Sequence, residues 1–192
     1  MTRQSTTPIR FVSRNTFKLR EAAEILKIAN VEVIPLEITI EELQTQDTER
    51  LVKHKTMRAF QEVGRPLFVE HTGLYLDYLK GLPGGLTQIF WDTLEADNFA
   101  QLFGQNADPT VIARTVIGYT DARRFFQFQG EVRGRIAAEP VGDREFQWDC
   151  VFVPEGSSKT FAEMGEAKHE ISMRRKALDA FAAFLKERWH DS

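Results

Sequence analysis

The sequence predicts an α/β protein in which helices pack on a mixed β-sheet. In the first third of the chain, short apolar runs alternate with segments of helical periodicity, which is typical of parallel strand–helix units. The centre of the chain instead has extended runs joined by short turns, which indicates an antiparallel meander. With 192 residues and 42% hydrophobic content, the chain can bury one substantial core. We therefore expect a single domain over residues 1–192, with residues 1–8 disordered.

Two strand–helix units open the chain. The first has a strand at residues 10–12 and a helix whose apolar residues recur with helical spacing between Ala22 and Ala29. The second has a strand at residues 31–36, rich in β-branched side chains, and a helix at residues 47–63. Because a strand–helix–strand crossover is right-handed, we expect these two strands to be parallel.

A third apolar run, PLFVEHTGL at residues 66–74, predicts a short buried strand that leads into an acidic residue, a histidine and a turn at Gly73. Beyond it we expect extended chain at residues 75–79, a tight loop at 81–85 and a helix at 93–103. The strand therefore delivers a carboxylate and an imidazole to one end of the sheet.

The second half of the chain changes character. Extended runs at residues 111–119, 123–128 and 131–136, joined by short turns, predict the antiparallel meander. A further strand is expected at residues 151–153, and a C-terminal helix from about Ser172. The sequence contains no internal repeat and no linker rich enough in Gly, Pro or Ser to divide the chain.

Composition excludes several classes of protein. The net charge of -3 comes from well-mixed acids and bases, so the chain lacks the cationic field that binds a nucleic-acid backbone. Cys150 is the only cysteine, which excludes an internal disulfide and a cysteine-based zinc site and favours a reducing compartment. The start MTRQSTTPIR lacks the apolar run of a signal peptide, and no segment approaches the roughly 20 apolar residues of a membrane span. We expect a soluble, cytoplasmic protein.

The segment Ser13-Arg14-Asn15-Thr16-Phe17-Lys18 lies between a strand and the start of a helix. Unpaired N–H groups and the helix dipole attract anions at such a position, and Lys18 adds a positive charge one turn into the helix. In the alternative interpretation, Ser13 or Asn15 only caps the helix and Lys18 is a solvated surface residue. Taken alone, this segment favours the alternative.

Acidic residues follow two of the predicted strands. Glu41 and Glu42 come after the second strand, and Glu70 comes at the end of the third. The carboxyl ends of strands in parallel sheets are where ligands bind, and carboxylates from separate strands can share a divalent cation. Oxygen ligands without cysteine indicate Mg²⁺ or Mn²⁺. A capping role for Glu41 and Glu42 is an equally good interpretation of these two residues alone.

Two C-terminal segments combine rings and charges. Phe146, Trp148 and Asp149 are a set that can stack on a nucleobase and accept hydrogen bonds from its edge, although aromatic residues beside a strand are more often core. In the second segment, Lys168 and Arg174 could reach a base carbonyl or a phosphate. Ser172, between them, is a natural N-cap of the last helix.

In their order along the chain, these segments resemble the inosine triphosphate pyrophosphatase family, which hydrolyses non-standard purine nucleoside triphosphates to monophosphate and pyrophosphate. The resemblance runs from Phe11 to about Leu185. It is carried by the blocks SRNTFKLREAAEIL, EELQ, VEHTGLYLDYLKGLPG, FQWDCVFVPEGSSKTFAEM and KHEISMRRKAL. It implies an elongated, curved mixed sheet flanked by helices, two lobes with a central cleft, and a homodimer.

The resemblance also implies roles for individual residues. It assigns the triphosphate to Ser13, Asn15, Lys18 and Lys55. It assigns the metal, Mg²⁺ or Mn²⁺, to Glu42 and Glu70, with His71 beside them. It assigns the base pocket to Phe146, Trp148 and Asp149, and recognition of the six-position carbonyl to Lys168, Ser172 and Arg174. The catalytic candidates are His71, Glu70 and Lys18.

The chain departs from the family pattern at several of these positions. Arg14 and Gln147 stand where the family has glycine, Cys150 where it has proline, and Met173 where it has histidine. The largest departure is His71, because the family has an aspartate there. His71 could be a replacement base or metal ligand, it could mark loss of catalysis, or it could be a bystander while Glu70 or Glu41 takes over.

We predict retained pyrophosphatase activity on an altered nucleotide, because the phosphate, metal and base elements all persist. With histidine in the catalytic position, we expect a preference for manganese or cobalt over magnesium. The alternative is a catalytically impaired nucleotide-binding or regulatory paralogue. A nucleic-acid or membrane module is a distant third.

Overall fold

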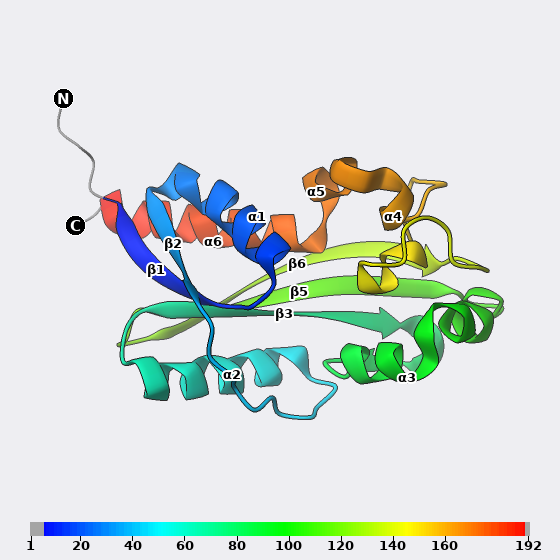
Figure 1. The fold of residues 1–192 in the computed structure, drawn as a ribbon, viewed down its shortest axis with the longest axis horizontal. Helices are drawn as coiled ribbons and strands as arrows, with labels where there is room; N and C mark the ends of the chain where they lie inside the picture. The colour runs from blue at the N-terminus through cyan, green and yellow to red at the C-terminus, as the bar shows by residue number, and fades with distance from the viewer. Residues whose placement is uncertain (1–5, 191–192) are drawn as a thin grey trace.

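The structure is a computed structural model that describes residues 6–190, and side chains for residues 6–188. It is elongated, and one mixed sheet runs along most of its length (Figure 1). The strands are β1 (Thr7–Val12), β2 (Val31–Leu36), β3 (Leu67–Leu76), β4 (Pro83–Gly84), β5 (Thr110–Thr120), β6 (Phe125–Ile136) and β7 (Phe152–Pro154). Their order is β2-β1-β3-β5-β6-β7, with β4 paired to β3.

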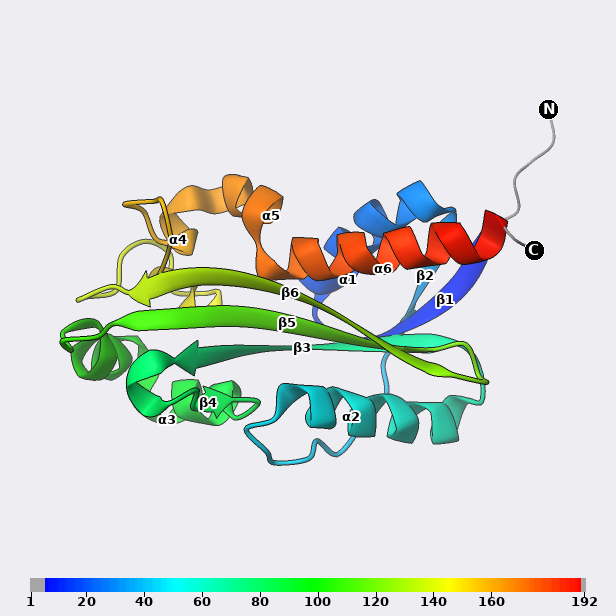
Figure 2. The same ribbon diagram turned by 180° about the vertical axis from the view of Figure 1, so that it is seen from behind.

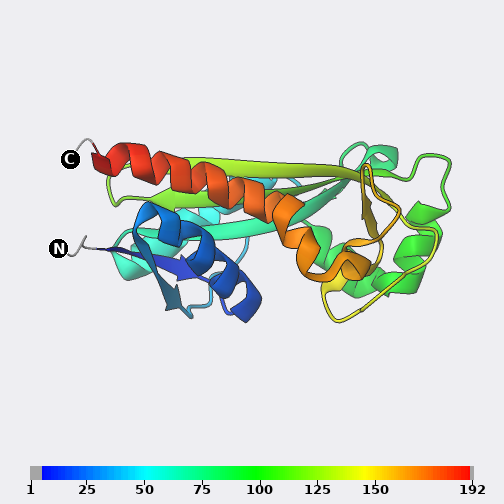
Figure 3. The same cartoon turned by 90° about the horizontal axis from the view of Figure 1, so that it is seen from above.

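Helices cover both faces of this sheet. The longer ones are α1 (Thr16–Leu26), α2 (Thr48–Val63), α3 (Thr87–Phe99) and α6 (Met173–His190), and the short ones are α4 (Phe161–Met164) and α5 (Lys168–Ile171). Helices α1 and α6 lie on one face, and α2 and α3 lie on the other (Figures 1 and 2). Figure 3 shows α6 running along the sheet beside α1. None of the described helices is both long and apolar enough to cross a membrane.

Parallel and antiparallel pairing divide the sheet as predicted. Strand β1 pairs in parallel with β2 and β3, whereas β3–β5, β5–β6 and β6–β7 are antiparallel. Aromatic rings join the parallel part to α6, since Phe11 stacks on Phe68 with centroids 4.2 Å apart and Phe68 contacts Phe181. The predicted mixed sheet flanked by helices is confirmed.

The pairing of β3 leaves an opening in the sheet. Strand β1 pairs only with Leu67 and Phe68 of β3, and β4 pairs only with Leu74 and Tyr75. Between these two contacts, the edge of β3 that faces away from β5 has no partner strand in the described part of the chain. Glu70 and His71 lie in this stretch. The opening is therefore where a ligand can approach the two side chains.

The predicted turn at Gly73 is wrong, because β3 continues through it to Leu76. A Cβ atom at Gly73 would lie 2.4 Å from the carbonyl oxygen of Gly84, closer than any side chain allows. Glycine is needed there so that β4 can approach β3. The expectation of extended chain at residues 75–79 also fails at its end, since Asp77–Leu79 form a 3-10 turn.

Two further boundaries differ from the prediction. Strand β6 is continuous across Gly130. A Cβ atom at Gly130 would lie 2.2 Å from the carbonyl oxygen of Met173, so the glycine is needed for the close approach of α6 and does not turn the chain. Helix α3 begins at Thr87, six residues before the expected start. The buried Thr87 hydroxyl donates to the carbonyl of Gly84 and accepts from the amide of Leu74, which ties the helix start to β3.

At the N-terminus we expected disorder over residues 1–8. Residues 1–5 lie outside the described part of the chain. Thr7 and Pro8 already belong to β1 and pair with Val31 and Glu32 of β2. Residues 7 and 8 are therefore part of the sheet, contrary to the expectation for these two positions.

Candidate active site

A cleft of about 510 Å³ lies at the opening beside β3. The β1–α1 loop, the segment before α2, the start of α3 and the segments around α5 contribute its walls. All thirteen predicted site residues line it: Ser13, Asn15, Lys18, Glu42, Lys55, Glu70, His71, Phe146, Trp148, Asp149, Lys168, Ser172 and Arg174. Glu41, the alternative acidic candidate, does not line this cleft.

The loop before α1 both caps the helix and carries a cation into the cleft. The Asn15 side chain accepts a hydrogen bond from the amide of Lys18 at 3.1 Å, and the Ser13 hydroxyl accepts one from the amide of Asn15 at 3.2 Å. The capping interpretation therefore holds for Asn15, whereas Ser13 binds the amide of the cap residue itself. Lys18, however, is not a solvated surface residue, because its Nζ lies 2.9 Å from Glu70 Oε1. Burial lowers the pKa of Lys18, although Glu70 acts in the opposite direction.

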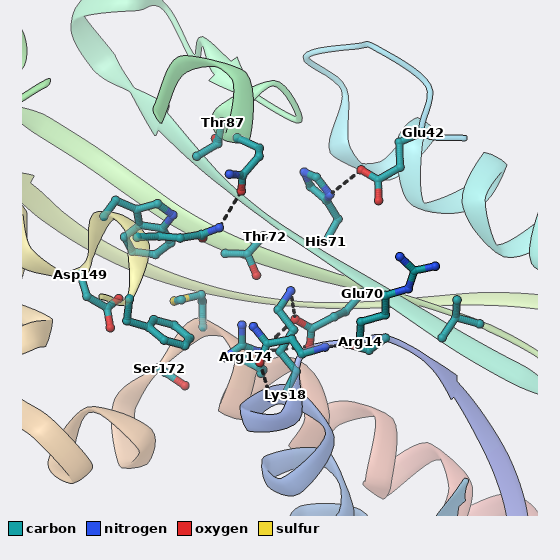
Figure 4. Close-up of a pocket in the computed structure, with 18 of the residues that line it drawn as sticks. Arg14, Lys18, Glu42, Glu70, His71, Thr72, Thr87, Asp149, Ser172 and Arg174 are labelled. Carbon is teal, nitrogen blue, oxygen red and sulfur yellow. Dashed lines mark hydrogen bonds and ion pairs between the residues drawn. The ribbon is translucent and has the colours of Figure 1, made fainter. Parts of the chain in front are cut away.

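Glu70 is the centre of a buried ion network. Arg174 Nε lies 3.0 and 3.1 Å from the two carboxylate oxygens, and Lys18 binds the first of them (Figure 4). Burial alone would raise the pKa of Glu70, but Arg174 and Lys18 outweigh it and hold the pKa at about 2. Glu70 is a carboxylate at neutral pH. Arg174, predicted to recognise the base, is occupied here by the predicted metal ligand.

His71 points to the opposite side of β3 from Glu70, as alternation along a strand requires (Figure 4). Its Nε2 lies 3.1 Å from the carbonyl oxygen of Gly85. A carbonyl oxygen can only accept, so Nε2 carries the hydrogen and donates it. Burial lowers the pKa of His71 to about 4, despite the Glu42 carboxylate, so the ring is neutral at pH 7. Its lone pair is then on Nδ1, which lies 3.7 Å from Glu42 Oε2.

Glu42 has a second partner in this region. Lys55, from α2, hydrogen-bonds the carboxylate of Glu42. Burial would raise the pKa of Glu42, but Lys55 more than compensates and the pKa is lowered. Glu42 therefore stays charged. Its Oε2 and the Nδ1 of His71 are both hydrogen-bond acceptors, so no hydrogen lies between them.

The base end of the cleft is built differently. Lys168 hydrogen-bonds the buried Asp149, and its Nζ lies 4.1 Å from the ring centroid of Phe146. Burial raises the pKa of Asp149 even though Lys168 opposes it. Trp148 is only 5% exposed and packs edge-on against Phe152, so most of its ring belongs to the core. The Ser172 hydroxyl accepts from the amide of Arg175 at 3.0 Å and caps α6.

Comparison with known proteins gives this cleft its context. A model of the Ham1 family matches residues 9–184. The chain belongs to the Ham1 family. It is 35% identical to a dITP/XTP pyrophosphatase from Methanopyrus kandleri over 178 residues, covering 92% of this chain and 95% of the relative. It is also 35% identical to an inosine triphosphate pyrophosphatase from Yarrowia lipolytica over 186 residues, covering 95% and 97%.

Solved Ham1 structures have the same fold. A HAM1 protein from Coxiella burnetii superposes with a TM-score of 0.81 at 24% identity, covering 95% of this chain and 100% of the other. The Staphylococcus aureus Ham1 protein gives a TM-score of 0.77 at 23% identity, covering 95% and 100%. The predicted family resemblance and the predicted fold class are both confirmed.

Sequence reasoning missed Glu21, which contacts the cleft residue Arg174, and Gln88, which lines this Ham1 cleft. Glu21 accepts from Arg174 Nη1 at 3.2 Å, while its other oxygen is buried without a hydrogen-bond partner, 3.4 Å from His169 Nδ1. Glu21 follows Lys18 by three residues on one helix face, a spacing that could have revealed it. Gln88 hydrogen-bonds Gln147 at 2.6 Å, and it was missed because the start of α3 was placed too late.

Metal-ligand types are present in the cleft but not gathered as a closed site. Among the described residues, no group of three or more His, Cys, Asp and Glu side chains is placed to hold an ion. The donor set of His71 and Glu42 nevertheless fits a divalent cation. His71 Nδ1 and Glu42 Oε2 are both acceptors and have no hydrogen between them. The other ring nitrogen of His71, Nε2, donates its hydrogen to a backbone carbonyl, as the second nitrogen of metal-binding histidines usually does.

Proposed function

We propose that this protein hydrolyses non-standard purine nucleoside triphosphates or deoxynucleoside triphosphates to the monophosphate and pyrophosphate, in a metal-dependent reaction. Membership of the Ham1 family and the names of its dITP/XTP and inosine triphosphate pyrophosphatase relatives support this substrate class. The observation that carries the proposal is the gathering of cationic, acidic and aromatic side chains from segments far apart in sequence into one cleft.

In the proposed reaction, the oxygen of a water molecule attacks a phosphorus of the α–β phosphoanhydride, the bridging oxygen leaves with the other phosphorus, and the proton lost by the water passes to the solvent. Reactions of this type depend mostly on positioning and on neutralising phosphate charge. Lys18 and Lys55 are the cations that would contact the triphosphate. Each is already ion-paired, to Glu70 and Glu42, which orients it before substrate arrives.

Glu42 and His71 are the residues that would hold the metal. When bound, a divalent cation neutralises phosphate charge and lowers the pKa of water. Glu70, the third predicted ligand, is engaged by Lys18 and Arg174, so joining the metal would require one of these contacts to give way. We assign Glu70 the role of orienting the two cations. A donor set of one imidazole and one carboxylate suits manganese or cobalt better than magnesium.

At the other end, Phe146 and Asp149 would receive the base, with Lys168 beside them. The ring of Phe146 offers a surface for stacking, and the buried Asp149–Lys168 pair offers one acceptor and one donor to polar atoms of the base. Ser172 and Arg174 are less free to recognise the base, because the hydroxyl caps α6 and the guanidinium binds Glu70 and Glu21.

A single assay tests the activity. Purified protein is incubated with ITP, dITP, XTP, GTP and ATP, each with Mg²⁺, Mn²⁺ or Co²⁺, and released pyrophosphate is measured. We expect release from ITP, dITP or XTP that is faster with Mn²⁺ or Co²⁺ than with Mg²⁺. Release from no pair of nucleotide and metal would contradict the proposal.

The second candidate is a nucleotide-binding or regulatory protein without turnover, and His71 is the observation that favours it. A neutral imidazole lacks the negative charge of the aspartate found at this position in the family. The substitution His71→Asp distinguishes the two functions. If His71→Asp creates pyrophosphate release where the wild-type protein binds nucleotide but releases none, the second candidate is correct.

We also expect a homodimer, which rests on the family resemblance. Size-exclusion chromatography with light scattering would measure the mass. A mass near the 22.1 kDa of one chain, at concentrations used for the assay, would contradict this expectation.

A further inference from the structure

Arg14 differs from the other cations of the cleft. Five Lys and Arg side chains line it: Arg14, Lys18, Lys55, Lys168 and Arg174. Four of them contact a carboxylate: Lys18 with Glu70, Lys55 with Glu42, Lys168 with Asp149, and Arg174 with Glu70 and Glu21. No Asp or Glu of the described chain lies within ion-pair distance of Arg14. Its charge is therefore not neutralised inside the protein.

The position of Arg14 is fixed on both sides. It lies between Ser13, whose hydroxyl accepts a hydrogen bond from the amide of Asn15, and Asn15, whose side chain caps helix α1. Its Nη2 donates a hydrogen bond to the hydroxyl of Thr39, which belongs to the segment between β2 and α2. The guanidinium thus reaches from one wall of the cleft to the other, toward the side that carries Glu42 (Figure 4). Its other N–H groups can still bind a ligand.

Arg14, which is exposed in the cleft, is the lining cation at which a polyanion meets no carboxylate competitor among the described residues. A phosphate that binds Lys18 or Lys55 must compete with Glu70 or Glu42. At Arg14 it meets no such competitor. The planar guanidinium also suits two oxygens of one phosphate group, which an ammonium cannot match.

The location of Arg14 indicates which phosphates it meets. In Figure 4, Asp149 and Arg14 lie toward opposite ends of the cleft, with Lys18, Glu70 and His71 between them. A nucleotide whose base lies at Phe146 and Asp149 would extend its phosphates toward Arg14. We propose that Arg14, positioned by Thr39, binds the β- and γ-phosphates, the part of the substrate that leaves as pyrophosphate. This inference rests on the proposed function for the orientation of the nucleotide.

Binding of inorganic pyrophosphate tests the inference without turnover. Isothermal titration with pyrophosphate in EDTA reports on the protein's own cations. We expect Arg14→Ala to weaken pyrophosphate binding about tenfold or more, because a charged hydrogen bond is lost. Arg14→Lys keeps the charge but loses the planar guanidinium that can bind two phosphate oxygens, so we expect an intermediate loss of affinity. Thr39→Val, which keeps the guanidinium but not its anchor, should weaken binding by roughly two- to threefold.

Two controls test whether the loss of affinity is specific to Arg14 and to the β- and γ-phosphates. Arg123→Ala removes the same charge from an exposed side chain in the turn between β5 and β6, and should leave affinity unchanged. IMP, which carries only the α-phosphate, should bind Arg14→Ala and wild-type protein alike. Unchanged pyrophosphate affinity in Arg14→Ala, an equal loss for IMP, or absence of pyrophosphate binding by the wild-type protein would each overturn the proposal. Absence of hydrolysis with every nucleotide would instead contradict the proposed function, while the pyrophosphate titration still decides the role of Arg14.

Discussion

The two ends of the cleft are built on different kinds of structure. At the phosphate end, Lys18, Lys55, Glu70 and His71 stand on α1, α2 and β3, elements of ten residues or more, whereas Arg14 and Glu42 stand on loops. At the base end, Asp149 stands on a four-residue 3-10 turn at Gln147–Cys150, Phe146 directly precedes this turn, and Lys168 stands on the four-residue helix α5. Regular elements fix the direction of a side chain through the backbone, whereas short turns depend on side-chain contacts. Phosphate geometry should therefore be the rigid part of this site, and base selection the adaptable part.

The largest expected effect is on the buried network of the phosphate end. Arg174→Met removes the guanidinium that contacts both Glu70 and Glu21 and leaves the half-buried Glu21 with only His169 near its carboxylate. Breaking one partner of a buried pair typically costs about 3–5 kcal/mol in the free energy of unfolding. Urea denaturation would measure it. Glu131→Gln, which breaks the half-exposed pair with Arg114, is the control and should cost less than about 1 kcal/mol. Similar losses in both variants would show that the buried network contributes no more to stability than a half-exposed ion pair.

The same network should govern acid stability. The pKa of Glu70 is about 2 in the folded protein, below its ordinary value of 4.5. A depressed pKa contributes stability above about pH 4.5, and this contribution is lost as the pH falls toward 2. The wild-type protein should thus lose stability over this range, on the order of a few kcal/mol, more steeply than Glu70→Gln. Unfolding free energies measured at several pH values would check it, and parallel curves for the two proteins would refute it.

The comparison also predicts two distinct kinetic effects. Lys55→Met, at the phosphate end, should lower kcat/KM for every nucleotide by a similar factor. Lys168→Met, at the base end, should change the ratio of kcat/KM for ITP to that for ATP by roughly tenfold, since it leaves Asp149 unpaired beside the base. Pyrophosphate release with both nucleotides would measure the ratio. The distinction between the two ends fails if Lys55→Met changes the ratio as much as Lys168→Met.

The smallest effect concerns the backbone of the base-end turn. Gln147 has a φ of 46°, in the left-handed region, and its side chain hydrogen-bonds Gln88. Gln147→Ala and Gln147→Gly both remove the hydrogen bond, but only glycine relieves the backbone. We expect the glycine variant to be more stable than the alanine variant by about 1 kcal/mol. Thermal unfolding would compare them, and an alanine variant as stable as the glycine variant would be inconsistent with strain.

Local patterns were sufficient for most elements. Strands β1 and β2 and helix α2 were predicted within a few residues, because apolar periodicity and caps such as Asp47 are properties of adjacent residues. The errors occurred where a residue is needed for the packing of a segment that is distant in sequence. Gly73 was interpreted as a turn, and Gly130 lies between two runs that were expected to be joined by a turn, although each glycine admits a backbone from elsewhere in the fold.

The site shows the same limit. Motifs contiguous in sequence revealed which residues line the cleft, but not which of them contact each other. Glu70 and Arg174 are 104 residues apart, and no local pattern indicates that one binds the other. The predicted base-recognising role of Arg174 rested on its charge and on the family resemblance, and its burial against two carboxylates became visible only in three dimensions.

Strand β3 has a consequence for how this protein could have diverged. Because neighbouring residues of a strand face opposite sides, Glu70 turns to α1 and α6, while His71 turns to Glu42 and Gly85. Ten paired residues with β5 hold this alternation in register. Mutation at position 71 can therefore explore new chemistry while the ion network that stabilises the other face stays intact. The fold thus separates a residue whose replacement leaves the ion network intact from the neighbour on which that network depends.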